Sequence, residues 1–253
     1  PQYWRNREAM PDEASHYQTR TFDLGLAFLE AHHEADNWVL HLESFDPHEP
    51  YFVPERYRGL YPDVPGEYFD WPPYRAVGEN ESEDDVRRCR LQAAALHTMC
   101  DASLGRVLDV MDAHGMWEDT QLIVNTDHGF LLGEHGSWAK CWAPFYDEVA
   151  HVPLFIWDPR SGAAGERREA LVQTIDLPAT ILEYHGVDRP PDMQGVPLRA
   201  TVADDTPVRE AALFGLFGGH VNCTDGRYVY MRGPAGEANA PLNEYTLMPT
   251  RHG

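Results

Sequence analysis

The stretch QLIVNTDHGFLLGEHGSWAK, residues 121–140, decides the fold class. Its apolar run 122–124 predicts a buried strand, and the run ends abruptly at the polar string 125–129. In open α/β sheets, ligands sit outside the carboxyl ends of strands. Asp127 offers a hard anionic oxygen at such a point and His128 a neutral nitrogen, so the pattern predicts metal ligands. The alternative interpretation is an aspartate that caps the next helix, beside a surface histidine.

The same stretch ends at Lys140, which is the only lysine of the chain, since every other Lys or Arg position is arginine. An ammonium group is a compact, strongly hydrated point charge, whereas a guanidinium is a planar fork. A sequence that otherwise always uses arginine therefore indicates a specific role for Lys140.

The pattern NTDHG-x3-GEHG-x3-K resembles the sulfatase family, within the alkaline phosphatase superfamily. The resemblance implies that Asp127 and His128 bind the active-site metal and that Lys140 contacts the sulfate. It also places His135 among the substrate-binding residues. Calcium is the metal that the resemblance favours, with manganese, magnesium and zinc as alternatives.

A second feature of the same family is the sequence DPHEPY at residues 46–51, which follows a predicted strand at 38–42. The resemblance implies that His48 lies on the leaving-group side of the substrate, where an imidazole can stabilise or protonate a departing oxygen. We therefore expect His48 and Lys140 to be the catalytic pair, both in contact with substrate. The alternative is a proline-stiffened surface turn with an incidental histidine.

Composition sets the remaining bounds. The chain has 253 residues, of which 43% are hydrophobic, and this predicts a soluble protein with a substantial core. A net charge of −21 argues against nucleic acid as a partner, and no apolar run approaches the ~18 residues of a membrane span. No secretory signal is visible in residues 1–10. The four cysteines form no zinc pattern and are interpreted as buried thiols, which favours a reducing, cytoplasmic location.

The rest of the chain predicts an α/β fold: a mixed, alkaline-phosphatase-like sheet flanked by helices, with a small C-terminal antiparallel α+β unit. Residues 1–16 are predicted to form an irregular N-terminal segment that leads into the first helix, and residues 59–80 a packed, aromatic lid. Asp176 reads as a helix cap, and Asp225-Gly226 as a hairpin turn. We assign residues 1–200 to the catalytic domain and 201–253 to the C-terminal unit. Further elements are expected as helices at 17–31, 82–115 and 174–182, and as strands at 152–157, 211–217, 220–224 and 228–231.

The resemblance implies metal-dependent hydrolysis of an anionic sulfate ester, with a formylglycine made from cysteine as nucleophile. None of the four cysteines stands in a C-x-P-S-R or C-x-A-x-R setting. We therefore expect a C-terminal portion of the family's fold, inactive alone, with an exposed strand edge that needs a missing segment or companion chain. Two alternatives stay open: a phosphonate or phosphate ester hydrolase, favoured by His128 where many sulfatases have asparagine, and a non-catalytic acidic binding module.

Overall fold

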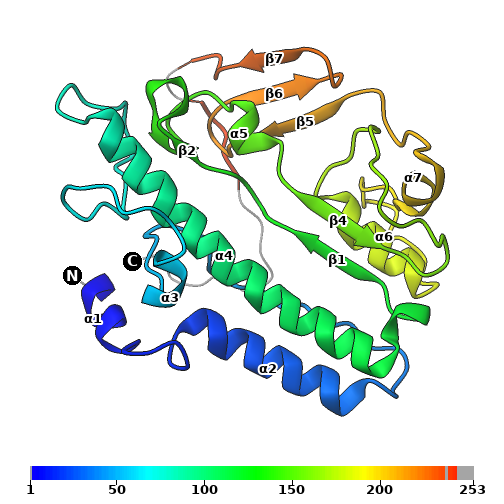
Figure 1. The fold of residues 1–253 in the computed structure, drawn as a ribbon. Helices are drawn as coiled ribbons and strands as arrows, with labels where there is room; N and C mark the ends of the chain where they lie inside the picture. Colours follow the sequence, from blue (N-terminus) through cyan, green and yellow to red (C-terminus); the bar gives the residue numbers. More distant parts are fainter. Residues whose placement is uncertain (1, 237–238, 244–253) are drawn as a thin grey trace.

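A long helix, α4 (Glu83–His114), runs through the middle of the molecule in the computed structural model, which describes residues 2–236 and 239–243 (Figure 1). Its N-terminus carries a capping box in which the Ser82 hydroxyl and the Asp85 carboxylate each accept a hydrogen bond from the other's backbone N–H. Its C-terminus stops at Gly115, whose φ of 64° lies in the left-handed region. The helix predicted from these signals is confirmed.

Two shorter helices, α2 (Tyr17–His32) and α3 (Glu55–Arg58), pack against α4. The main core lies between α4 and the loops beside it and includes fully buried Leu96 and Trp138. The prediction of an irregular lead-in is wrong for α1 (Gln2–Glu8), which is helical. The sequence of α1 shows no apolar periodicity, but its Arg7 stacks on Phe52 and pairs with Asp70, so tertiary contacts hold it.

The strands form antiparallel sheets throughout the described residues, so the predicted mixed sheet is not what this chain builds by itself. Strand β1 (Leu122–Asn125) pairs with β4 (Leu154–Trp157), and β2 (Leu131–Leu132) pairs with β3 (Trp138–Ala139). The chain between β1 and β4 returns through the β2–β3 hairpin and the short helix α5 (Asp147–Ala150). This return brings the chain back alongside β1 in the opposite direction, so the pair is antiparallel. With one partner each, β1 and β4 are half-buried or exposed rather than buried, and Phe155 is 67% exposed.

The segment predicted as a strand, 38–42, forms no strand and belongs to no sheet. Its burial alternates: Trp38, Leu40 and Leu42 are half-buried, whereas Val39 and His41 are exposed. Trp38 and Leu40 pack in the apolar cluster formed by α2, α4 and the start of β1. The period-two pattern was therefore real, but no described strand lies beside this segment to hydrogen-bond with it.

The C-terminal unit is a three-stranded antiparallel sheet of β5 (Ala212–Gly215), β6 (Val221–Thr224) and β7 (Val229–Arg232), seen at the top of Figure 1. The predicted turn between β6 and β7 is confirmed, with Gly226 at a φ of 86°. Helices α6 (Asp176–Tyr184) and α7 (Arg199–Asp204) precede it. The domain boundary at residue 200 stays a prediction, and residues 244–253 lie outside the described residues. Within the described chain, no helix has the length and apolarity of a membrane span.

Asp176 does not cap α6, contrary to the sequence interpretation. Its carboxylate is fully buried and binds the Arg209 guanidinium through two hydrogen bonds of 2.6 and 2.5 Å. It also accepts hydrogen bonds from the backbone N–H groups of Gln173 and Val196. Asp176 therefore ties α6 to the segment that leads into β5.

Candidate active site

The turn after β1 depends on a close approach of two backbones at Gly129. A Cβ atom at this position would lie 1.9 Å from the carbonyl oxygen of Glu148. The Gly129 N–H also donates to the carbonyl of Val149 at 2.9 Å. Only glycine fits here, and the fit brings Asp127 and His128, the two residues before it, to the edge of α5.

We expect Gly129→Ala to destabilise the protein by roughly 1–3 kcal/mol, because the clashing atom is backbone and cannot rotate away. Urea unfolding followed by circular dichroism measures this effect. Gly136→Ala is an informative comparison, because its φ of 63° strains an alanine although no atom lies within 4 Å of the added Cβ. Equal losses in both variants would contradict the steric argument.

The β2–β3 hairpin delivers Lys140. Trp138 and Ala139 are fully buried, and the Trp138 indole N–H donates to the Glu81 carboxylate at 2.9 Å. Lys140 is flanked by two non-glycine residues in the left-handed region, Ala139 at a φ of 67° and Cys141 at 69°. Such strain clusters at functional sites, where the surrounding packing sustains it. The backbone around Lys140 is thus held in one unusual shape.

Cys141 corrects the interpretation of the cysteines as buried packing residues. Its side chain is exposed, whereas Cys89 is buried and Cys100 and Cys223 are half-buried. All four are free thiols. Burial raises the pKa of Cys89 and of Cys100 to about 12, so these two thiols are protonated at neutral pH.

Lys140 and His48 converge, although 92 positions separate them. The Lys140 Nζ lies 2.8 Å from His48 Nε2 and 3.3 Å from His128 Nε2. It lies 3.6 Å from a carboxylate oxygen of Glu49 and over the ring of Phe130 at 5.7 Å from the centroid. Lys140 is only 7% exposed, so its charge is largely desolvated and depends on these neighbours.

The donors and acceptors around both histidines assign their tautomers. His48 Nδ1 lies 2.5 Å from the Glu49 carbonyl, and His128 Nδ1 lies 3.0 Å from the Gly129 carbonyl. A carbonyl only accepts, so each Nδ1 carries the proton. An ammonium only donates, so each Nε2 presents its lone pair to Lys140. Both imidazoles are therefore oriented with Nε2 toward the same point.

The donor set of Asp127 and His128 fits part of a divalent metal site. An Asp127 carboxylate oxygen lies 3.2 Å from His128 Nε2, with two lone-pair donors facing each other. Two ligands of one ion lie about 3 Å apart, because each is roughly 2.0–2.6 Å from the metal. Asp127 is largely exposed, and the described residues contain no group of three or more His, Cys, Asp or Glu side chains arranged to hold a metal. Asp127 and His128 are thus two ligands of a metal site that needs further ligands.

His135 lies apart from this cluster. Its ring stacks on Tyr146 at 3.8 Å between centroids, and its Nε2 lies 3.1 Å from the Glu148 carboxylate. Among the described residues no hydrogen bond or ion pair joins it to Lys140, and its role in substrate binding stays a prediction.

Sequence reasoning missed two residues of the cluster, Glu49 and Tyr74. The Glu49 carboxylate is 3% exposed and accepts a hydrogen bond from the Tyr74 hydroxyl. Burial, and next the hydrogen bond to Glu49, raise the pKa of Tyr74, so its phenol stays protonated and donates. Tyr74 belongs to the predicted lid, whose residues 75 and 77 also hydrogen-bond to the backbone around β3. The signal available in the sequence was a carboxylate placed between His48 and Pro50 in a proline-stiffened turn.

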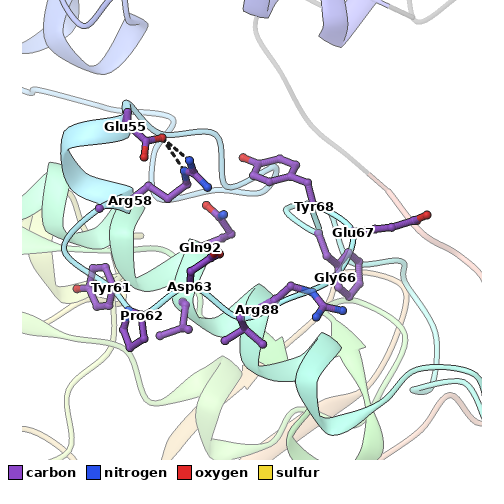
Figure 2. Close-up of a pocket in the computed structure, with 14 residues that line it drawn as sticks. Glu55, Arg58, Tyr61, Pro62, Asp63, Gly66, Glu67, Tyr68, Arg88 and Gln92 are labelled. Atoms are coloured by element: carbon purple, nitrogen blue, oxygen red, sulfur yellow. Dashed lines mark hydrogen bonds and ion pairs between the residues drawn. The ribbon is translucent and has the colours of Figure 1, made fainter.

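The lid also lines a cavity that is not at this site. A hollow of about 320 Å³ lies between the lid and α4, and Figure 2 shows Arg58, Tyr68, Arg88 and Gln92 around it. None of the five candidate residues lines it. The packed lid predicted from the sequence therefore covers α4 at one end and reaches Glu49 at the other.

Asp46, two residues before His48, has a side chain that is 10% exposed and lies beside buried His16, with 3.6 Å between Oδ2 and Nδ1. Burial raises the pKa of Asp46 to about 7 and lowers the pKa of His16. Between pH 4 and 7 the folded protein therefore holds a proton on Asp46 that the unfolded chain releases. Stability contributed by this group is present at low pH and is lost as pH rises through 7.

We expect Asp46→Asn to remove this loss. A pKa difference of one unit between the folded and unfolded states corresponds to about 1.4 kcal/mol. Between pH 4.5 and 8, the free energy of unfolding of the wild type should therefore fall, relative to that of the variant, by on the order of a few kcal/mol. Urea unfolding at both pH values measures the difference. His16 acts in the opposite direction but is present in both proteins. A variant that keeps the wild-type pH slope would refute the role of Asp46.

Comparison with known proteins identifies the fold and the family of the chain. Over 88% of its residues, the chain superposes on 53% of the phosphonate monoester hydrolase of Agrobacterium radiobacter, with a TM-score of 0.73 and 21% identity. The fold is therefore that of the alkaline-phosphatase-like hydrolases. The sequence model of the family named Sulfatase matches residues 1–187, and the chain belongs to that family.

Two curated relatives show how much of the family's length is present. The chain is 33% identical to N-acetylglucosamine-6-O-sulfatase of Bacteroides thetaiotaomicron over 118 residues, which cover 45% of this chain and 21% of the relative. It is 29% identical to the multifunctional alkaline phosphatase superfamily protein PehA of Trinickia caryophylli over 200 residues, which cover 67% and 38%. Both matches span less than half of the relative.

Proposed function

We propose that this chain supplies the oxyanion-binding and leaving-group residues of a metal-dependent sulfuric ester hydrolase. The observation that carries the proposal is the convergence of Lys140, His48 and His128 at one point beside Asp127. Family membership and the sulfatase named among the relatives support a sulfate ester as substrate.

In this proposal Lys140 binds an oxygen of the sulfate group and stabilises the charge that develops there during transfer. His48 presents Nε2 to the ester oxygen. For His48 to act as an acid, Nε2 must first gain a proton from solvent, because Lys140 has to keep its own proton, and so its charge, for the sulfate oxygen.

Asp127 and His128 would hold a divalent metal together with ligands from outside the described residues. Calcium is the proposed ion, with manganese, magnesium and zinc as alternatives; when bound it supplies positive charge to the sulfate oxygens. His128 contributes a nitrogen ligand that the Gly129 carbonyl keeps in the correct tautomer. The nucleophile, a formylglycine in the family, would likewise come from another segment.

We therefore expect this chain by itself not to turn over esters, because positioning a nucleophile supplies roughly 7–11 kcal/mol of barrier lowering. A nitrophenyl sulfate assay of the purified chain, with and without a companion segment that carries a C-x-P-S-R or C-x-A-x-R motif, tests this. Release of nitrophenolate only in the combined sample supports the proposal. Ordinary enzyme rates from the chain alone would contradict it, and loss of that rate in Cys141→Ser would make the exposed Cys141 the nucleophile.

A phosphonate monoester hydrolase is the second candidate. His128 favours it, because an imidazole ligand suits softer metals than calcium, and a structural neighbour carries that name. The same combined sample, given nitrophenyl phosphonate esters in place of sulfates, distinguishes the two by the larger kcat/KM. The third possibility, a non-catalytic binding module, predicts no turnover of either ester in the combined sample.

A further inference from the structure

Glu49 is the buried negative charge of the candidate site. One carboxylate oxygen, Oε1, is fixed by the hydroxyl of Tyr74. The other, Oε2, lies 3.2 Å from His48 Nδ1 and 3.6 Å from Lys140 Nζ. Oε2 accepts no hydrogen bond within the described residues. Tyr74 therefore holds the carboxylate so that Oε2, which accepts no hydrogen bond from the described residues, faces His48 and Lys140, the two residues that would meet the substrate.

This charge changes what Lys140 offers to an anion. Lys140 attracts every negative charge on a ligand, while Glu49 repels every one, and burial leaves both effects weakly screened. With Glu49 and Lys140 both present, a second negative charge on the ligand adds little to the binding free energy. Without Glu49, the positive charge of Lys140 would be uncompensated, and the site would bind a dianion more tightly than a monoanion.

We propose that Glu49, held by Tyr74, makes this site selective for monoanionic esters over dianionic phosphate monoesters of the same tetrahedral shape. The inference rests on the proposed function, in which Lys140 binds the oxyanion. It names Glu49 as a specificity residue, whose effect on the ligand is exerted through its charge. Sulfate esters and phosphonate monoesters are both monoanions, so the inference holds for either proposed activity.

The lone lysine makes a direct test available. Lysine labelled with ¹³C at Cε gives one resonance, that of Lys140, in the full chain. We would titrate this resonance with methyl sulfate, a monoanion, and with methyl phosphate, a dianion at pH 8 because its second pKa is about 6. The preference is the ratio of the two dissociation constants. For charges about 6 Å apart at an effective dielectric constant of about 20, Glu49→Gln should shift this ratio toward methyl phosphate by tenfold or more.

Matched variants separate charge from packing. Glu49→Asp keeps the charge and should keep the wild-type preference, whereas Glu67→Gln removes an exposed carboxylate of the lid and should change nothing. Tyr74→Phe releases Oε1 and should shift the preference in the same direction as Glu49→Gln, but less; it serves if Glu49→Gln does not fold. Equal weakening of both ligands in Glu49→Gln would show a packing role only and overturn the inference.

The proposed function fails in a different way. If neither ligand moves the Lys140 resonance of the wild type, Lys140 is not an oxyanion site, and both the function and this inference fall. Binding of both ligands with a preference that Glu49→Gln leaves unchanged overturns the inference alone.

Discussion

Lys140→Met is expected to lower kcat/KM by roughly 10²–10³-fold when the chain is assayed with its companion segment, because a preorganised charge at the transferring group is worth that much. Lys140→Arg should fail almost as badly. The Lys140 ammonium is a point charge, and its surroundings accommodate one: the neighbours are His48, His128, Glu49 and Phe130. The planar guanidinium of arginine needs more room and a different direction of approach.

Stability separates the two substitutions. Methionine leaves Glu49 as an unpaired buried carboxylate, which costs about 3–5 kcal/mol, whereas arginine keeps a positive charge near it. Urea unfolding measures this difference. Arg87→Met, which removes one positive charge from the exposed surface of α4, is the matched control and should leave both rate and stability unchanged. A Lys140→Arg enzyme with wild-type kcat/KM would mean that only the charge matters at this position.

Asp176→Ala is expected to be the most damaging substitution outside the site, lowering the free energy of unfolding by about 3–5 kcal/mol. The change removes the carboxylate that pairs with the Arg209 guanidinium, and it leaves the backbone N–H groups of Gln173 and Val196 without their acceptor. Because the pair joins α6 to the approach to β5, the C-terminal sheet should lose its attachment before the rest of the fold unfolds.

A double-mutant cycle with Arg209→Met tests this explanation. Removing both charges should cost less than removing Asp176 alone, since no unpaired charge remains. Glu210→Ala, an exposed carboxylate one residue from Arg209, is the control and should stay within about 0.5 kcal/mol of wild type. Additive effects in the cycle would show that the two side chains act independently.

The sequence predicted local features well where the signal was itself local. The capping residues around α4 and the Asp225-Gly226 turn both act over a few positions, and both were found where expected. The period-two pattern at 38–42 was also local, and the alternation of burial that it predicts is present. The segment does not form a sheet strand because no described strand lies beside it, and the sequence of one segment cannot specify its partner.

The candidate site followed the same division. His48, Asp127, His128 and Lys140 were identified from motifs, and the structure brings them together. Glu49 and Tyr74 were missed because their importance arises only when the lid folds back over the DPHEPY turn. Asp176 was misassigned for the same reason: its partner, Arg209, lies 33 positions away, and no local pattern distinguishes a helix cap from a buried ion pair.

The segment at 38–42 has a consequence for hydrogen exchange. Its course is set by the side chains of Trp38 and Leu40 against α2 and α4, and no backbone hydrogen bond joins it to another part of the described chain. Amide protection follows hydrogen bonding, so its N–H groups should exchange with deuterium as fast as those of a loop, although three of its five side chains are half-buried. A strand bound alongside would slow that exchange without moving a side chain.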